Sequence, residues 1–209
     1  MKFNRGQWLA HFFCLLPLCV VVFNFFQGSL TANPIQYLTI KSGRTAINLL
    51  IITLMGTPLK TIFGLSAFIS IRKITGIYAL FYALMHFFVF AVLDFGFRPD
   101  WMIDEIRYKP FLQIGLVGLV ILIVLGITSL NSIKKVLKNF WKPVQRTVYL
   151  ASGLGILHHL LAVKGDLFIP LLQFFLFAAL MLLRLRFVRS RMIFHSEQLT
   201  RLNQFLLSN

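Results

Sequence analysis

Long apolar stretches separated by short polar segments dominate this sequence. Each stretch is close to the ~20 residues that an α-helix needs to cross a membrane at about 1.5 Å per residue. We expect membrane helices over residues 8–26, 45–63, 74–95, 110–130, 144–163 and 168–187. Residues 64–71 are apolar but too short to span, so we expect them at the membrane interface. The pattern predicts an all-α integral membrane protein, a bundle of about six transmembrane helices.

The basic residues between these stretches predict the orientation of the bundle. With the N-terminus in the cytoplasm, 15 of the 21 Lys and Arg residues fall on the inner side. An excess of basic residues marks cytoplasmic loops, and an even helix count returns the chain to the same side, so we expect both termini to be cytoplasmic. Residues 1–190 form the expected membrane domain. Residues 191–209 form a short basic tail, which we expect to rest on the anionic inner leaflet.

Composition supports a membrane location and argues against a nucleic-acid-binding domain. Hydrophobic residues make up 58% of the chain and charged residues only 13%, whereas soluble proteins carry roughly a quarter charged residues. The net charge of +15 would suit nucleic acid, but the basic residues lie between apolar runs and in the tail. Membrane lipid is therefore the expected partner of these charges.

Three histidines fall at membrane depth, where ionisable side chains are costly and often functional. Counted along their helices, His86 lies roughly 18 Å and His158 roughly 21 Å from the cytoplasmic boundary. Both helices run outward, so the two imidazoles reach matched depths and could hold one heme iron from both sides. A bare metal ion would usually need three or four ligands. Two hydrogen-bonded histidines that stabilise helix packing are the alternative.

The neighbours of these histidines have expected roles of their own. His159 points about 100° away from His158, so it is a packing, propionate-binding or reserve-ligand residue. Arg44, at the outer end of its helix, is expected either to bind a heme propionate or to extend to the interface. Gly153 and Gly155 would leave space for the ring. The aromatic residues expected around it are Phe81, Phe87, Phe88 and Phe90.

No catalytic triad, phosphate-binding glycine loop or paired carboxylate site is visible in the sequence. We therefore expect a heme protein that transfers electrons and has no organic substrate site of its own. Several segments carry a family resemblance, at residues 42–46, 72–76, 84–86, 109–111, 126–129, 148–149, 157–159 and 163–164. Together they resemble MsrQ, the heme-binding membrane subunit of the bacterial periplasmic methionine-sulfoxide reductase system, a relative of ferric-reductase transmembrane domains. The resemblance implies an electron-transfer subunit of an oxidoreductase system and not the catalytic subunit.

The resemblance implies a bacterial inner-membrane cytochrome that binds heme b, with FMN as a second family cofactor. It would take electrons from the quinone pool and pass them to a periplasmic molybdopterin-containing subunit that repairs oxidised methionines in proteins. His86 and His158 match the family's histidines on the third and fifth helices, as axial ligands of the heme iron.

One departure from the family pattern leaves the number of hemes open. The family usually has a further histidine after a Trp near the start of the fifth helix, whereas here Trp141 is followed by Gln145. Two other functions stay open: a ferric-reductase-like cytochrome serving another acceptor, and a small transporter or structural membrane protein. The lack of paired intramembrane charges weighs against the last of these.

Overall fold

A computed structural model describes residues 4–185 and 197–208 of the chain, and in these residues every regular element is helical. The longer helices are α1 (Arg5–Phe26), α2 (Pro34–Phe63), α3 (Ala67–Phe88), α5 (Pro110–Thr128), α8 (Val148–Ala162) and α9 (Phe168–Leu182). The shorter ones are α4 (Pro99–Tyr108), α6 (Asn131–Leu137), α7 (Trp141–Arg146) and α11 (Glu197–Leu207). A π-helical segment, η1 (Val89–Asp94), extends α3, and a 3₁₀ turn, η2 (Lys138–Phe140), precedes α7.

Local sequence signals explain where α1 and α2 begin and end. The side chain of Asn4 accepts a hydrogen bond from the amide of Gln7 (2.9 Å), and Gln7 returns the bond to Asn4, which forms a capping box. The side chain of Asn33 caps α2 by accepting a hydrogen bond from the amide of Gln36 (3.0 Å), with Pro34 in the first turn, where proline needs no hydrogen bond. At the other end Gly64 adopts φ 72°, a left-handed conformation that favours glycine and stops the helix.

Among the described residues, four helices are long and apolar enough to cross a membrane: α1, α2, α3 together with η1, and α5. The α9 helix is a shorter apolar helix of 15 residues. The α8 helix also has 15 residues, but α7 leads into it through Thr147, whose backbone is itself near-helical. The helical stretch from Trp141 to Ala162 therefore covers most of the expected fifth span, 144–163.

Two boundaries differ from the sequence-based expectation. The α2 helix begins at Pro34 and not near residue 45, so Lys41 and Arg44 lie inside it. Residues 67–71 do not form a separate interfacial segment but are the first turns of α3, which continues through Arg72. Long basic side chains can extend toward a membrane surface from inside a helix, so charges alone do not mark a helix end.

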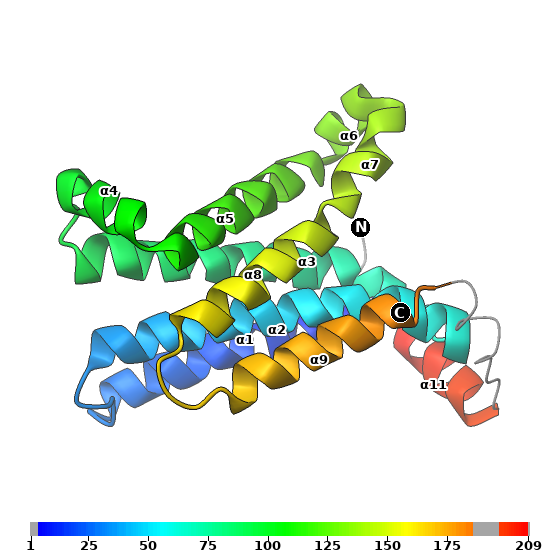
Figure 1. The fold of residues 1–209 in the computed structure, drawn as a ribbon. Coiled ribbons are helices and arrows are strands. Elements are labelled where there is room, and N and C mark those ends of the chain that lie inside the picture. The colour runs from blue at the N-terminus through cyan, green and yellow to red at the C-terminus, as the bar shows by residue number, and fades with distance from the viewer. Residues whose placement is uncertain (1–3, 186–196, 209) are drawn as a thin grey trace.

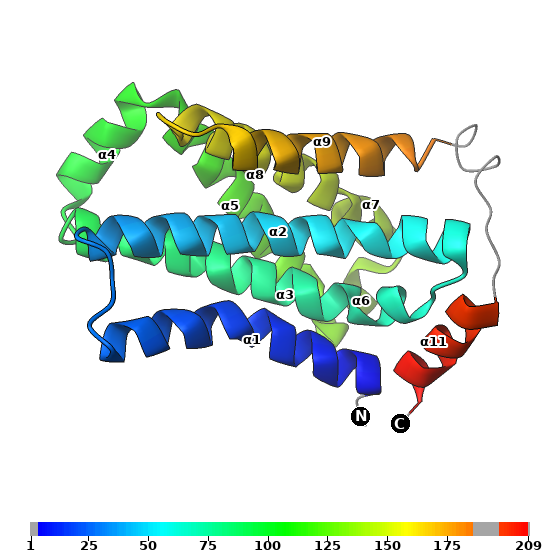
Figure 2. The same cartoon turned by 90° about the horizontal axis from the view of Figure 1, so that it is seen from below.

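The longer helices lie side by side, with α1 on one side of α2 and α3, and α8 and α9 on the other (Figure 2). The turn between α1 and α2, helix α4 and the α8–α9 connection gather at one end of the bundle (Figure 1). The start of α1 and helix α11 lie at the opposite end, where the amide of Arg5 donates to the carbonyl of Ser208 (3.1 Å). Asn203 of α11 accepts a hydrogen bond from the amide of Ala67 at the start of α3 (2.9 Å). The expected domain boundary near residue 190 lies outside the described residues.

The bundle core lies along the seam between α2 and α3, where Leu54, Ala79 and Tyr82 are almost completely buried. Large apolar side chains on the outer faces are exposed instead, among them Phe12 and Phe13 of α1 and Phe175 of α9, each more than 60% exposed. Water-soluble proteins rarely expose so much contiguous apolar surface, so these faces suit lipid.

Candidate functional site

The structure brings His86 and His158 together between two helix pairs. His86 lies near the end of α3, which packs along α2, and His158 lies on α8, which packs along α5. The centroids of their rings are 6.0 Å apart, and the ring planes are nearly perpendicular, at 82°. The two imidazoles are therefore close neighbours between the two helix pairs.

Each of these imidazoles is held by the backbone of its partner helix. The Nδ1 atom of His86 lies 2.9 Å from the carbonyl oxygen of Thr39 on α2, and that of His158 lies 2.7 Å from the carbonyl oxygen of Phe111 on α5. A carbonyl can only accept, so both Nδ1 atoms carry the proton and donate it. The lone pair of each neutral ring is then on Nε2, and metal-binding histidines in proteins use this arrangement.

Glycines on α2 and α5 provide the space for these rings. A Cβ atom on Gly43 would lie 3.0 Å from Nδ1 of His86, and one on Gly115 would lie 2.7 Å from Nδ1 of His158. Sequence reasoning assigned the space-making role to Gly153 and Gly155 instead. A Cβ atom at either of those two positions would make only an ordinary contact, at 3.7 Å.

His159 takes part in a polar chain that sequence reasoning did not find. Its Nδ1 lies 2.7 Å from Oε1 of Gln173 on α9, and Nε2 of Gln173 donates to Oδ1 of Asn48 on α2 (2.7 Å). The side chain of Gln173 is only 2% exposed, and its amide oxygen and nitrogen each take part in one of these two hydrogen bonds. A single Gln in the apolar run of α9 and a single Asn in α2 were the available signals. Through these hydrogen bonds His159 of α8 is linked to α9 and α2.

Arg44 directly follows Gly43, the residue of α2 that lies beside the ring of His86. Its Nε atom is buried and has no hydrogen-bond partner among the described residues. The ion pair that the described residues form, between Lys109 and Glu105, is elsewhere, at the junction of α4 and α5. A guanidinium whose Nε is buried and that forms no ion pair among the described residues suits a carboxylate ligand, because its planar fork matches two carboxylate oxygens.

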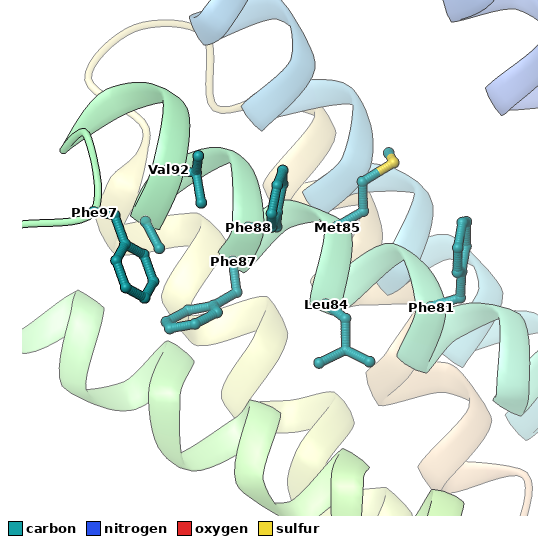
Figure 3. A pocket seen from close by; sticks show the side chains of 8 residues that line it. Phe81, Leu84, Met85, Phe87, Phe88, Val92 and Phe97 are labelled. Atoms are coloured by element: carbon teal, nitrogen blue, oxygen red, sulfur yellow. The ribbon is translucent and has the colours of Figure 1, made fainter.

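The aromatic surroundings differ from the expected set. Phe111 is the ring found beside His158, with centroids 5.9 Å apart. Phe81, Phe87 and Phe88 instead line a groove of about 480 Å³ along α3 and η1, to which neither histidine contributes (Figure 3). Phe88 follows His86 by two residues, which is roughly 200° around a helix, so it points to the opposite side.

Gln145, at the position where a family histidine was expected, forms hydrogen bonds to α5. Its Nε2 donates to Oγ1 of Thr128 (2.9 Å) and to the carbonyl of Leu125 (3.2 Å). Nε1 of Trp141 donates to the carbonyl of Thr128 (2.9 Å). These bonds fasten the α7–α8 helical stretch to the end of α5, so the side chain of Gln145 has a structural role here.

Comparison with known proteins places these residues in a recognised group. The family described as ferric reductase like transmembrane component matches residues 42–156, a range that includes Gly43, His86 and Gly115 and ends just before His158. The "Protein-methionine-sulfoxide reductase heme-binding subunit MsrQ" of Brucella anthropi is 33% identical over 183 residues, which cover 86% of this chain and 83% of the relative. The protein of the same name from Bordetella pertussis is 34% identical over 148 residues, 70% of this chain and 72% of the relative.

Proposed function

Since this chain belongs to the ferric-reductase-like transmembrane family and, within it, to the MsrQ heme-binding subunits, we propose that it is a membrane electron-transfer subunit that binds heme b. The observation that carries the proposal is the pair formed by His86 and His158, two imidazoles that different helix pairs bring close together.

The separation of the two rings fits a shared iron. A metal–imidazole bond is about 2.0–2.1 Å long, so two imidazoles that would hold one metal between them must come close together. The observed separation is 6.0 Å. The described residues gather no group of three or more His, Cys, Asp or Glu side chains that could hold a bare metal ion. Two axial ligands are what a heme iron requires of a protein.

The residues around the site would bind and orient the group. The carbonyls of Thr39 and Phe111 hold both histidines in the tautomer whose Nε2 can ligate. Arg44 would bind a propionate of the heme. The hydrogen bond between His159 and Gln173 would fix α8 and α9 beside the heme. The bound heme supplies reversible one-electron redox chemistry, and the buried apolar packing of α2 against α3 keeps water away from this region.

The wider electron route follows the family. The names of the relatives refer to a protein-methionine-sulfoxide reductase, and electrons would leave this chain to such an enzyme. As the family resemblance implies, the electrons would come from the quinone pool, and the acceptor would be periplasmic and contain molybdopterin. FMN stays a prediction of the family resemblance. Gln145 is committed to Thr128 and Leu125, which favours a single heme in this chain. A ferric-reductase-like cytochrome that serves another acceptor is the second candidate, supported by the family match over residues 42–156.

The proposed topology is six membrane spans in the bacterial inner membrane, with both termini in the cytoplasm. The placement of the N-terminus beside α11, at the opposite end from the α1–α2 and α8–α9 connections, supports an even number of spans (Figure 2). The basic residues support a cytoplasmic location for that end, since 15 of 21 belong to it in this arrangement. His86 and His158 would then lie toward the periplasmic half, close to an acceptor outside the membrane.

Membrane vesicles from bacteria that express or lack this protein test the function. With the periplasmic reductase partner present, quinol-driven reduction of protein-bound methionine sulfoxide should require this chain, and His86→Ala should abolish it. Unchanged turnover without the chain would reject the proposed acceptor. A chain whose heme is reduced by quinol but which does not support that turnover would favour the second candidate.

A further inference from the structure

Gly43 and Gly115 are in contact with the two ligand histidines but cannot themselves ligate or hydrogen-bond through a side chain. A Cβ atom on Gly43 would lie 3.0 Å from Nδ1 and 3.1 Å from Cε1 of His86. One on Gly115 would lie 2.7 Å from Nδ1 and 2.9 Å from Cε1 of His158. Non-bonded carbon atoms prefer separations of about 3.5–4.0 Å, so any larger residue would have to displace the ring.

The same geometry occurs in both helix pairs. Each histidine lies 47 residues after the carbonyl that its Nδ1 contacts, in the α2–α3 pair as in the α5–α8 pair. Each carbonyl, of Thr39 and of Phe111, lies four residues before the glycine, so it is the one that the glycine's own N–H meets in an α-helix. The absence of a glycine side chain is what lets the imidazole reach a carbonyl that is already part of the helix.

This arrangement restricts how each ring can rotate. The Nδ1–H···O=C bond directs one edge of the imidazole at the helix, and the glycine beneath leaves room for the ring in that orientation. The result is two ring planes that cross at 82°. For low-spin ferric heme with two imidazole ligands, the angle between the ligand planes controls the splitting of the iron d orbitals. Perpendicular planes give a highly anisotropic signal in electron paramagnetic resonance, and parallel planes give a rhombic one.

We propose that Gly43 and Gly115 are positioning residues that hold the two imidazole ligands nearly perpendicular and thereby set the electronic structure of the iron, an inference that rests on the proposed heme function. Ligand orientation and hydrogen bonding around the axial ligands are among the means by which a protein tunes a heme. The glycines act through the histidines and do not touch the iron.

The test compares frozen-solution electron paramagnetic resonance spectra of the oxidised, full-length protein and its glycine variants. Wild type should show the highly anisotropic low-spin signal. Gly115→Ala should convert it to a rhombic signal or lower the heme content several-fold, and Gly43→Ala should do so less, because its Cβ meets the ring at 3.0 Å and not at 2.7 Å. Alanine favours a helix over glycine by roughly 0.5–1 kcal/mol, so loss of helix propensity cannot explain these effects.

Two glycines in the same helix pairs provide matched controls. On α5, Gly118→Ala would place a Cβ atom 3.7 Å from Cβ of Leu154, an ordinary contact. On α3, Gly76→Ala would place one 3.8 Å from Cγ2 of Thr53. Both control variants should keep the heme content and signal of wild type. If Gly115→Ala fails to fold, the spectrum of Gly43→Ala, whose Cβ contact with the ring is less severe, tests the inference.

The outcomes separate this inference from the proposed function. A colourless wild-type protein from heme-replete cells would reject heme binding, and the inference with it. A heme-loaded wild type with a rhombic signal would overturn the inference alone. The inference would also be overturned if Gly43→Ala and Gly115→Ala showed the same signal as wild type, as the two control variants should. A folded Gly115→Ala variant that holds less heme than Gly118→Ala would support it.

Discussion

Tyr82 joins α3 to α1 at the point where proline weakens α1. Its side chain is only 1% exposed, and its hydroxyl donates to the carbonyl of Cys14 (2.8 Å) and accepts from the amide of Leu18 (3.2 Å). These two backbone groups are each other's partners in a regular α-helix. Pro17 lies between them and lacks an N–H, so the helix is already distorted there.

Replacing this tyrosine removes both hydrogen bonds without removing the buried ring. Hydrogen bonds between membrane helices contribute about 0.6 kcal/mol on average and up to about 1.7 kcal/mol each. With no water to replace them at this depth, we expect Tyr82→Phe to lower the free energy of unfolding by about 1–3 kcal/mol. Reversible unfolding of the purified protein in mixed micelles, titrated with a denaturing detergent, measures this change.

Tyr78→Phe is the matched control, because Tyr78 lies one turn earlier on α3 and bonds a side chain, Nδ1 of His11 (3.2 Å), and not the backbone. Its effect should be the smaller of the two. In a Pro17→Ala background, Cys14 and Leu18 can pair directly, so Tyr82→Phe should cost less than in wild type. A Tyr82→Phe variant as stable as wild type, combined with a destabilised Tyr82→Leu variant, would refute the hydrogen-bond argument and leave only packing.

Substitutions at three further positions test the site. Gln173→Leu leaves His159 and Asn48 without their shared partner, so the free energy of unfolding should fall by about 1–3 kcal/mol in the same micelle titration. Arg44→Leu should increase heme loss to apomyoglobin, measured by absorbance, whereas Arg44→Lys should restore part of the retention; equal loss rates in all three proteins would exclude a propionate contact. Gln145→His restores the imidazole that the family has at this position and should raise the number of hemes per chain, measured in a pyridine hemochrome assay. An unchanged heme-to-protein ratio would show that the missing histidine does not explain the lower heme number.

Depth along a helix was the part of the site that the sequence could predict. Counting about 1.5 Å per residue placed His86 and His158 at similar heights, and the structure has their rings 6.0 Å apart. Helical geometry also predicts that Phe88, two residues after His86, points away from it. The sequence-based expectation that Phe88 surrounds the heme did not take this rotation into account. The start of α2 was readable from Asn33 and Pro34, a capping residue and a first-turn proline, but Lys41 and Arg44 suggested a later start.

The contacts that orient the histidines could not be predicted from the sequence alone. They depend on which backbone carbonyl of a neighbouring helix, Thr39 or Phe111, lies beside each ring. That pairing is set by helix packing over 47 residues of sequence separation, not by local pattern. Gly115 does not stand out among the 13 glycines, and the segment 42–46 that contains Gly43 gives no sign of this role until the histidine rings are placed beside them.

A reduced-minus-oxidised absorbance spectrum with heme quantified per chain tests the central claim most directly. Wild-type protein purified from heme-replete cells should show the bands of a low-spin b-type heme. His86→Ala and His158→Ala should each remove those bands while the protein stays folded, and His159→Ala should keep them. Folded wild-type protein without heme, or single-histidine variants that retain the wild-type spectrum, would contradict an iron shared by His86 and His158.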